Sequence, residues 1–409
     1  MSAPTAMKPF FLSAAIVLCA GMAASAQSPQ LVDRQAEKNT RQVYQFLLGI
    51  ENEGKVLIGH QDDLAYGVGW KDVKGGSDVK GVCGDYPAVY GWELGDLEHA
   101  DAVQNLDTVN FEKMKGWIKD GYKRGGIITL SWHMDNFHTG GSAWDTTAAV
   151  RDILPGGPRH DAYKASLDRF ADFVGDLKAG GFLKRRNIPI LFRPFHEHSG
   201  FWFWWGNTHV TPDDYKALWQ FTVRYLRDVK GLHNLIYVFN TDENFRTEED
   251  YLRFYPGDEW VDMLTMDSYG SVKDLEGIAR LKQKLQLLRE MADRKGKPIA
   301  LAETGYMGIP QPDWWTRVLL QGILPEPGAK SISYVLFWRN ANDHHYFGPY
   351  PNQVSAADFQ AFYRHPVTVF EKEVKPLNRQ MRKNRKTAPA GPPLITLRDM
   401  STPTPAGEK

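Results

Sequence analysis

Two glutamates, Glu197 and Glu303, each follow a strongly apolar run and could work as a pair. Hydrolysis of a glycosidic bond with retention of configuration needs two carboxyl groups about 5–5.5 Å apart. One carboxyl protonates the leaving oxygen and the other attacks the anomeric carbon. A glutamate after a strand can instead cap a helix or hold a salt bridge. The pair therefore predicts glycoside chemistry if the fold makes the two side chains face each other.

Polar and aromatic neighbours could support this chemistry. Arg193 could keep a carboxylate ionised through paired hydrogen bonds, or form a structural salt bridge. Tyr269 could donate to the attacking carboxylate, or be a core tyrosine. His196 would point away from Glu197 along a strand, so we expect it to bind a sugar hydroxyl or to orient another group. Trp338 is placed to stack under a sugar ring, with barrel packing as its alternative.

Aromatic side chains are abundant, with 13 Trp and 17 Tyr among 409 residues. Sugar C–H faces pack on aromatic planes while hydroxyls bind polar groups, so rings around carboxylates indicate a carbohydrate cleft. Seven Trp follow or end apolar runs: Trp92, Trp132, Trp144, Trp202, Trp204, Trp205 and Trp338.

A metal site is the competing interpretation, because four histidines lie near these acids: His133, His138, His196 and His198. Zinc sites have three or four ligands at characteristic spacings, such as His-Glu-x-x-His on a helix. In His196-Glu197-His198 the alternation of a strand would put both histidines on one side and the glutamate on the other. We expect no metal and no cofactor, although a site of two histidines and a carboxylate stays open. Nucleophile-elbow and phosphate-loop motifs are absent from the sequence.

Eight apolar, β-rich runs position these residues. They are 56–60, 88–94, 126–133, 188–197, 235–241, 261–269, 299–304 and 332–338. Amphipathic helical patterns lie between or after them, at 110–124, 162–178, 212–230, 274–294, 313–324 and 356–372. Apolar strands alternating with helices predict a parallel sheet covered on both faces, and eight of them predict a closed (β/α)8 TIM barrel. The Gly-rich stretch 67–84 is predicted to be a loop.

In such a barrel the chemistry belongs at the carboxyl ends of the strands. Glu197 and Glu303 end the fourth and seventh runs, so they would face each other across the mouth.

Several motifs together resemble glycoside hydrolase family 26, whose typical members are β-mannanases. The motifs are Arg193-Pro-Phe-His-Glu-His-Ser-Gly, Phe201-Trp-Phe-Trp-Trp-Gly, Ala88-Val-Tyr-Gly-Trp, Met266-Asp-Ser-Tyr-Gly, Glu303-Thr-Gly and Leu336-Phe-Trp-Arg-Asn. The resemblance implies a retaining barrel enzyme with Glu197 as acid/base and Glu303 as nucleophile. It further implies that substrate is bound by His133, Arg193, His196, Trp202, Asp267, Tyr269 and Trp338.

The expected activity is cleavage of β-1,4-mannosidic linkages in mannan, galactomannan or glucomannan by double displacement. A barrel of the same fold acting on xylan or mixed-linkage glucan is an alternative, as is a non-catalytic carbohydrate-binding barrel. A degenerate barrel would be expected to have lost one carboxylate, whereas both are present. Lys+Arg and Asp+Glu are 49 each, which gives no electrostatic reason to expect nucleic acid as a partner. No stable protein partner is predicted.

The chain ends differ in character from the predicted catalytic domain, residues 27–377. Residues 1–26 have the pattern of a signal peptide, with Lys8, an apolar run and a small-x-small site at Ala24-Ser25-Ala26. We therefore expect export to the periplasm or the exterior, with a lipid anchor at Cys19 as an alternative. Cleavage would leave Cys83 as the only cysteine. Residues 378–409 are basic and then Pro/Thr-rich, which predicts a disordered tail.

Overall fold

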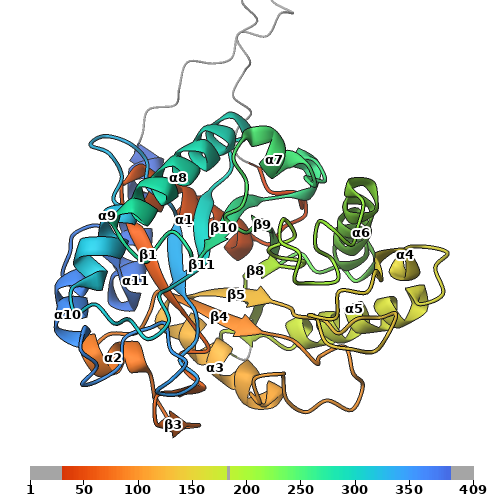
Figure 1. Cartoon of the computed structure of the whole chain (residues 1–409), viewed down its shortest axis with the longest axis horizontal. Helices are drawn as coiled ribbons and strands as arrows, with labels where there is room; N and C mark the ends of the chain where they lie inside the picture. Colours follow the sequence, from red (N-terminus) through yellow and green to blue (C-terminus); the bar gives the residue numbers. More distant parts are fainter. Residues whose placement is uncertain (1–29, 182–184, 388–409) are drawn as a thin grey trace, which may run out of the picture.

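The computed structural model describes residues 30–181 and 185–387. Within them, eight parallel strands form a ring in the order β1-β4-β5-β8-β9-β10-β11-β12, and pairing of β12 with β1 closes it. The ring lies at the centre of the molecule with helices around it (Figure 1). Its strands are β1 (Val56–Gln61), β4 (Val89–Glu93), β5 (Ile127–Ser131), β8 (Ile190–Arg193), β9 (Leu235–Thr241), β10 (Met263–Ser268), β11 (Ile299–Thr304) and β12 (Tyr334–Phe337). The predicted (β/α)8 barrel is confirmed.

The helices cover the outside of the ring and one end of it. They are α1 (Lys38–Asn52), α2 (Asp78–Cys83), α3 (Phe111–Arg124), α4 (Val150–Ile153), α5 (His160–Gly175), α6 (Pro212–Arg224) with η1 (Tyr225–Val229), α7 (Glu248–Leu252), η2 (Asp258–Trp260), α8 (Leu275–Lys295), η3 (Trp315–Leu319) with α9 (Leu320–Ile323), α10 (Ala356–Tyr363) and α11 (Glu371–Thr387). None of the helices in this part of the chain is long and apolar enough to cross a membrane.

Alternating side chains of each strand enter two different apolar clusters, as the period of two in a strand requires. The inner cluster takes Leu57, Val89 and Leu191 from the strands and Leu47 and Ile50 from α1. Helix α1 therefore closes the barrel at the amino ends of its strands.

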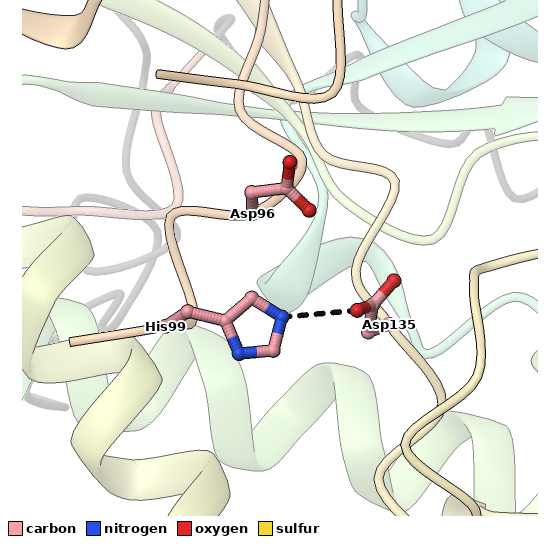
Figure 2. Close-up of side chains that lie close together, drawn as sticks. All are labelled: Asp96, His99 and Asp135. Carbon is pink, nitrogen blue, oxygen red and sulfur yellow. Dashed lines mark hydrogen bonds and ion pairs between the residues drawn. The ribbon is translucent and has the colours of Figure 1, made fainter. Parts of the chain in front are cut away.

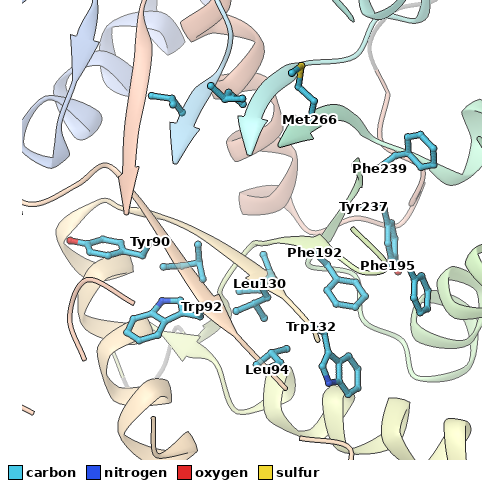
Figure 3. Close-up of a cluster of buried hydrophobic side chains, with 14 of the residues drawn as sticks. Tyr90, Trp92, Leu94, Leu130, Trp132, Phe192, Phe195, Tyr237, Phe239 and Met266 are labelled. Carbon is cyan, nitrogen blue, oxygen red and sulfur yellow. The ribbon is translucent and has the colours of Figure 1, made fainter. Parts of the chain in front are cut away.

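The outer cluster lies between the strands and the surrounding helices (Figure 3). It takes the intervening residues, such as Tyr90, Phe192 and Phe239, which are fully buried. Because every strand is covered on both faces, its sequence is apolar almost throughout.

Three predictions about elements are wrong. Segment 67–84 is not all loop, because α2 lies in it: Ser77 Oγ accepts from Lys80 N at the start and left-handed Gly84 ends the helix. A short hairpin, β2 (Tyr66–Gly67) with β3 (Trp70–Lys71), precedes it. Pattern 356–372 is not one helix, because α10 ends at Tyr363, shortly before Pro366. The short strand β13 (Thr368–Val369) then pairs with the start of β1.

The third correction concerns the predicted tail, since α11 continues to Thr387. Its residues Val374 and Met381 pack in the inner cluster near α1. The rest of the tail and the predicted signal peptide lie outside the described residues.

A second hairpin, β6 (Lys178–Ala179) with β7 (Arg186–Asn187), follows α5.

Candidate active site

Glu197, Asp267 and Glu303 meet at the carboxyl ends of the strands. One carboxylate oxygen of each lies within 4.8 Å of those of the other two. Asp267 and Glu303 are buried, whereas Glu197 is partly exposed. Carboxyl groups this close fit the short spacing of a retaining glycoside hydrolase rather than the spacing of about 6.5–9.5 Å of an inverting one.

A β-bulge turns Glu303 into the barrel. Along β11, Ile299 and Leu301 belong to the outer cluster and Ala300 and Ala302 to the inner one, so strict alternation would send Glu303 outward. The register with β10 shifts at this point, from Met266 opposite Leu301 to Asp267 opposite Glu303. The extra residue on β11 reverses the alternation, which is what a bulge does. Glu303 therefore points to the same interior as Asp267.

Two donors hold the carboxylate of Glu303. Arg193, an inward residue at the end of β8, donates to Oε1 from one guanidinium nitrogen and, at 2.8 Å, to Asp267 from the other. The hydroxyl of Tyr269 donates to Oε2 at 2.9 Å. Burial opposes the charge of Arg193, but Asp267 and Glu303 outweigh it and raise the pKa of the guanidinium. A permanent cation and a phenol thus hold the carboxylate of Glu303 in a fixed orientation.

Glu197 lies in a tight turn after β8, not on the strand. The strand ends at Arg193, and both Phe195 and Glu197 have left-handed backbone, with φ of 49° and 51°. The backbone N–H of Glu197 donates to Asn240 Oδ1 at 3.1 Å, which fixes this turn to β9. Such φ values are rare outside glycine and persist only where surrounding contacts hold them.

The carboxyl of Glu197 is electrostatically unlike that of Glu303. Burial raises its pKa well above the usual value, and the nearby Asp267 and Glu303 raise it further. Trp202 Nε1 donates to Oε2 at 2.7 Å and works in the opposite direction. One carboxyl that tends to stay protonated beside one held by a cation is the arrangement that acid and nucleophile roles require.

His196 and His198 do not lie together on one side of a strand, as alternation predicted. His196 Nε2 lies 3.0 Å from Nε2 of His133, at the edge of the site. His198 is turned away, with Nδ1 bound to the carbonyl of Asn240 and its ring packed against Tyr215 and Phe239. Strand alternation fails here because these residues follow the strand in a turn.

The tryptophans divide into two groups. Trp92, Trp132, Trp204 and Trp205 are fully buried, so their expected role in a carbohydrate face is wrong. Trp202 and Trp338 are partly exposed, and the indole of Trp144 stacks on His133 with ring centroids 5.1 Å apart. Of the rings available to a ligand, Trp202 therefore lies beside Glu197, while Trp144 and Trp338 lie beside His133.

Sequence reasoning left two positioning residues out of the site. Asn240 Oδ1 receives the Glu197 N–H, and its amide nitrogen donates to Asp267 Oδ1 at 2.9 Å. Glu93 binds His133 Nδ1 at 2.7 Å. Glu93 ends β4 and Asn240 lies one residue before the end of β9, but neither residue stands out in the sequence from other polar residues at strand ends.

A second group of possible metal ligands lies beside the mouth, formed by Asp96, His99 and Asp135 (Figure 2). His99 Nε2 bonds to Asp135 Oδ2 at 2.9 Å, and one ligand atom of each residue lies within 4.8 Å of the others. The group includes none of the histidines considered as ligands from sequence. Of those, His138 bonds to Asp152.

The family can now be stated, because residues 32–303 match the model of glycosyl hydrolase family 26. The chain belongs to glycosyl hydrolase family 26. This is a retaining family. Among its solved structures, a family 26 β-mannanase from Bacteroides ovatus is 43% identical with a TM-score of 0.76, covering 81% of this chain and 94% of that one. An endo-β-1,4-mannanase catalytic domain from Bacillus sp. JAMB-750 is 33% identical with a TM-score of 0.78, covering 86% and 96%.

Curated members of family 26 are also similar in sequence. A mannan endo-1,4-β-mannosidase from Bifidobacterium adolescentis is 35% identical over 298 residues, which is 70% of this chain but 29% of that protein. One from Bacillus subtilis is 31% identical over 314 residues, covering 72% of this chain and 78% of that protein.

Proposed function

We propose that this protein is a mannan endo-1,4-β-mannosidase that cleaves mannan, galactomannan or glucomannan with retention of configuration. The observation that carries the proposal is the pairing of Glu197 and Glu303 within 4.8 Å, one with a raised pKa and one held by Arg193 and Tyr269. The mannan specificity is supported by the relatives, since the B. ovatus and Bacillus structures and the two curated proteins are all described as mannanases.

The reaction has two steps. In the first, Glu303 attacks the anomeric carbon while Glu197 gives its proton to the departing glycosidic oxygen, leaving a covalent glycosyl-enzyme. In the second, ionised Glu197 takes a proton from water, whose oxygen displaces Glu303 from the sugar. His133, His196, Trp202, Asp267, Tyr269 and Trp338 surround the reacting sugar in this proposal, with Arg193 behind the nucleophile.

The protein is proposed to act outside the cytoplasm, because a polymer cannot enter the cell intact. The pattern of residues 1–26 supports export.

The test is incubation of the protein with linear mannan, galactomannan, xylan and barley β-glucan, with separation of the products. We expect cleavage of the mannans to mixed oligosaccharides, with viscosity falling before many reducing ends accumulate. ¹H NMR of the first product should show the β-anomer before it mutarotates. Preferential cleavage of xylan or β-glucan would replace the mannan assignment, and binding without cleavage would indicate a non-catalytic barrel.

Two variants assign the carboxyl roles. Glu303→Ala should lower turnover on the order of 10⁴-fold or more on every substrate, because the nucleophile is lost. Azide should not restore a retained product. Glu197→Ala should still turn over an aryl mannoside whose leaving group needs no protonation. If Glu197→Ala were equally inactive on aryl mannoside and polymer, it would not be the acid/base. The exposed Glu276→Gln in α8 serves as a control.

A further inference from the structure

Glu93, at the end of β4, is a buried carboxylate surrounded by four donors. Oε1 accepts from the backbone N–H groups of Gly95 and His133, both at 2.7 Å. Oε2 accepts from Ser131 Oγ at 2.8 Å and faces His133 Nδ1 at 2.7 Å. Burial alone would raise the pKa of Glu93, but His133 and the other donors outweigh it and lower the pKa to about 2. Glu93 is therefore ionised, although the proposed mechanism gives it no role.

The second nitrogen of His133 faces another histidine. Its Nε2 lies 3.0 Å from His196 Nε2, and a hydrogen bond between two ring nitrogens needs one proton between them. His196 is fully buried, and the positive charge of Arg193 acts on it. Both effects disfavour a positively charged His196. His133 by contrast has a carboxylate on its other side. This carboxylate favours His133 as the ring that holds the shared proton.

We propose that Glu93 is a positioning residue that keeps His133 protonated on both nitrogens, so that a positive charge stays beside Glu303 and His196 is a neutral acceptor at Nε2. The link to catalysis rests on the proposed function. The pKa of His133 agrees in direction, because burial lowers it but Glu93 and Glu303 together outweigh burial and raise it. That of His196 is lowered well below the usual value by burial and by Arg193 and His133.

The charged groups that face His133 come from three strands and the turn after β8. Glu93 on β4 and Glu303 on β11 favour its protonation, whereas Arg193 on β8 opposes it and the neutral His196 accepts from it. Asp107 is a further acid that interacts electrostatically with His133. The rings that contact His133 are uncharged: Trp144, Phe203 and Trp338. Because the cation acts on Glu303, its loss should make that carboxylate easier to protonate.

The decisive measurement is the protonation state of His133 in the intact protein. In ¹⁵N-histidine-labelled protein, both ring nitrogens of His133 should show imidazolium shifts at about pH 7.5, where an ordinary histidine with pKa about 6.5 is mostly neutral. The signals are assigned by their absence from His133→Asn. A neutral His133 in the wild-type protein at this pH would overturn the proposal.

Glu93→Gln tests the cause. We expect His133 to be neutral at about pH 7.5 in this variant. The acidic limb of kcat/KM on mannan should move to higher pH by about half a unit or more, because Glu303 loses its nearby cation. Glu98→Gln is the matched control, since Glu98 is a buried acid of the following loop that binds Trp132 and Asp135 instead. Glu98→Gln should leave His133 protonated and the acidic limb of kcat/KM at its wild-type pH.

The outcomes separate the two proposals. If Glu93→Gln leaves His133 an imidazolium and the acidic limb unchanged, Glu93 does not position it and the inference fails. If the protein cleaves no glycan, the proposed function fails, while the NMR titration still decides whether Glu93 controls the charge of His133.

Discussion

Trp202 sets how readily Glu197 gives up its proton. Its indole N–H bonds to Glu197 Oε2 at 2.7 Å and favours the ionised carboxylate. Trp202→Phe keeps an aromatic side chain but removes this donor, so the pKa of Glu197 should rise further. The acid must be protonated in the first step, and therefore the basic limb of kcat/KM should move to higher pH, by about half to one unit. A limb that moves to lower pH would contradict the assignment.

Trp260→Phe is the matched control for this pH profile. It removes an indole N–H that bonds to a surface carboxylate, Glu259, at 3.0 Å and outside the site. The profile should not change.

A variant of Trp338 can show whether this side chain stacks on substrate or packs in the core. Its side chain is partly exposed and belongs to neither apolar cluster, while its ring centroid lies 6.3 Å from that of His133. Trp338→Ala should lower kcat/KM on mannan about a hundredfold, or about 2.7 kcal/mol of transition-state stabilisation. The melting temperature should change by only a few degrees.

The contrast is Trp315→Ala, since Trp315 is fully buried among Phe337, Phe359 and Phe362. This variant should cost about 3–5 kcal/mol of unfolding free energy. If Trp338→Ala instead lost stability to that extent and kept its activity per folded molecule, Trp338 would be a core residue.

Residue types at strand ends indicated the two glutamates, Arg193 and Tyr269, because parallel strands bring their carboxyl ends to one face. The inward direction of Glu303 could not be predicted, since it depends on a bulge in β11 that leaves no mark on the apolar pattern. The left-handed turn at Phe195 and Glu197 was equally hidden. Buried and exposed tryptophans also look alike in sequence, because both follow apolar runs.

A buried ion pair joins α1 to α8 near the amino end of the barrel. Glu51 at the end of α1 binds Arg289 of α8 at 2.8 Å, the N–H of Ile299 in β11 at 2.6 Å, and Ser333 Oγ at 2.9 Å. Burial raises the pKa of Glu51 to about 7 in spite of these partners. The negative charge of Glu51 therefore depends strongly on the guanidinium of Arg289.

Arg289→Ala should leave a buried carboxylate without its partner and cost about 3–5 kcal/mol of unfolding free energy, measured by denaturant titration. Arg280→Ala, which removes an exposed pair with Glu276 on the same helix, should cost less than about 0.5 kcal/mol. Equal losses in the two variants would show that the Glu51–Arg289 pair contributes no more than a surface pair. Activity measured well below the melting temperature should be unchanged in both.

The barrel closes where β12 pairs with β1, and the packing at this seam leaves no room for a side chain at Gly59. Gly59 of β1 lies between β4 and β12, and a Cβ there would come within 3.0 Å of Val89 Cβ and 3.2 Å of Leu336 Cβ. Gly59→Ala should therefore overpack the inner cluster and cost about 1–3 kcal/mol in unfolding free energy.

The control is Gly116→Ala in α3, where a Cβ would meet nothing within 4 Å. There the change should stabilise the protein by about 0.5–1 kcal/mol, because alanine favours the helix. A Gly59→Ala protein as stable as the wild type would mean that the seam has room to adjust.

The helices that close the barrel at the amino ends of its strands also determine how the molecule would face when it is attached to a support or another module. Helix α1 and helix α11 both pack in the inner cluster at the end away from Glu197 and Glu303. Val32, which precedes α1, donates its backbone N–H to Asp262, the residue just before β10, on that same side. A support or partner module fastened at either end would therefore leave the carboxylates facing outward. An insoluble polymer, which cannot turn to meet the enzyme, could then still be reached by a tethered molecule.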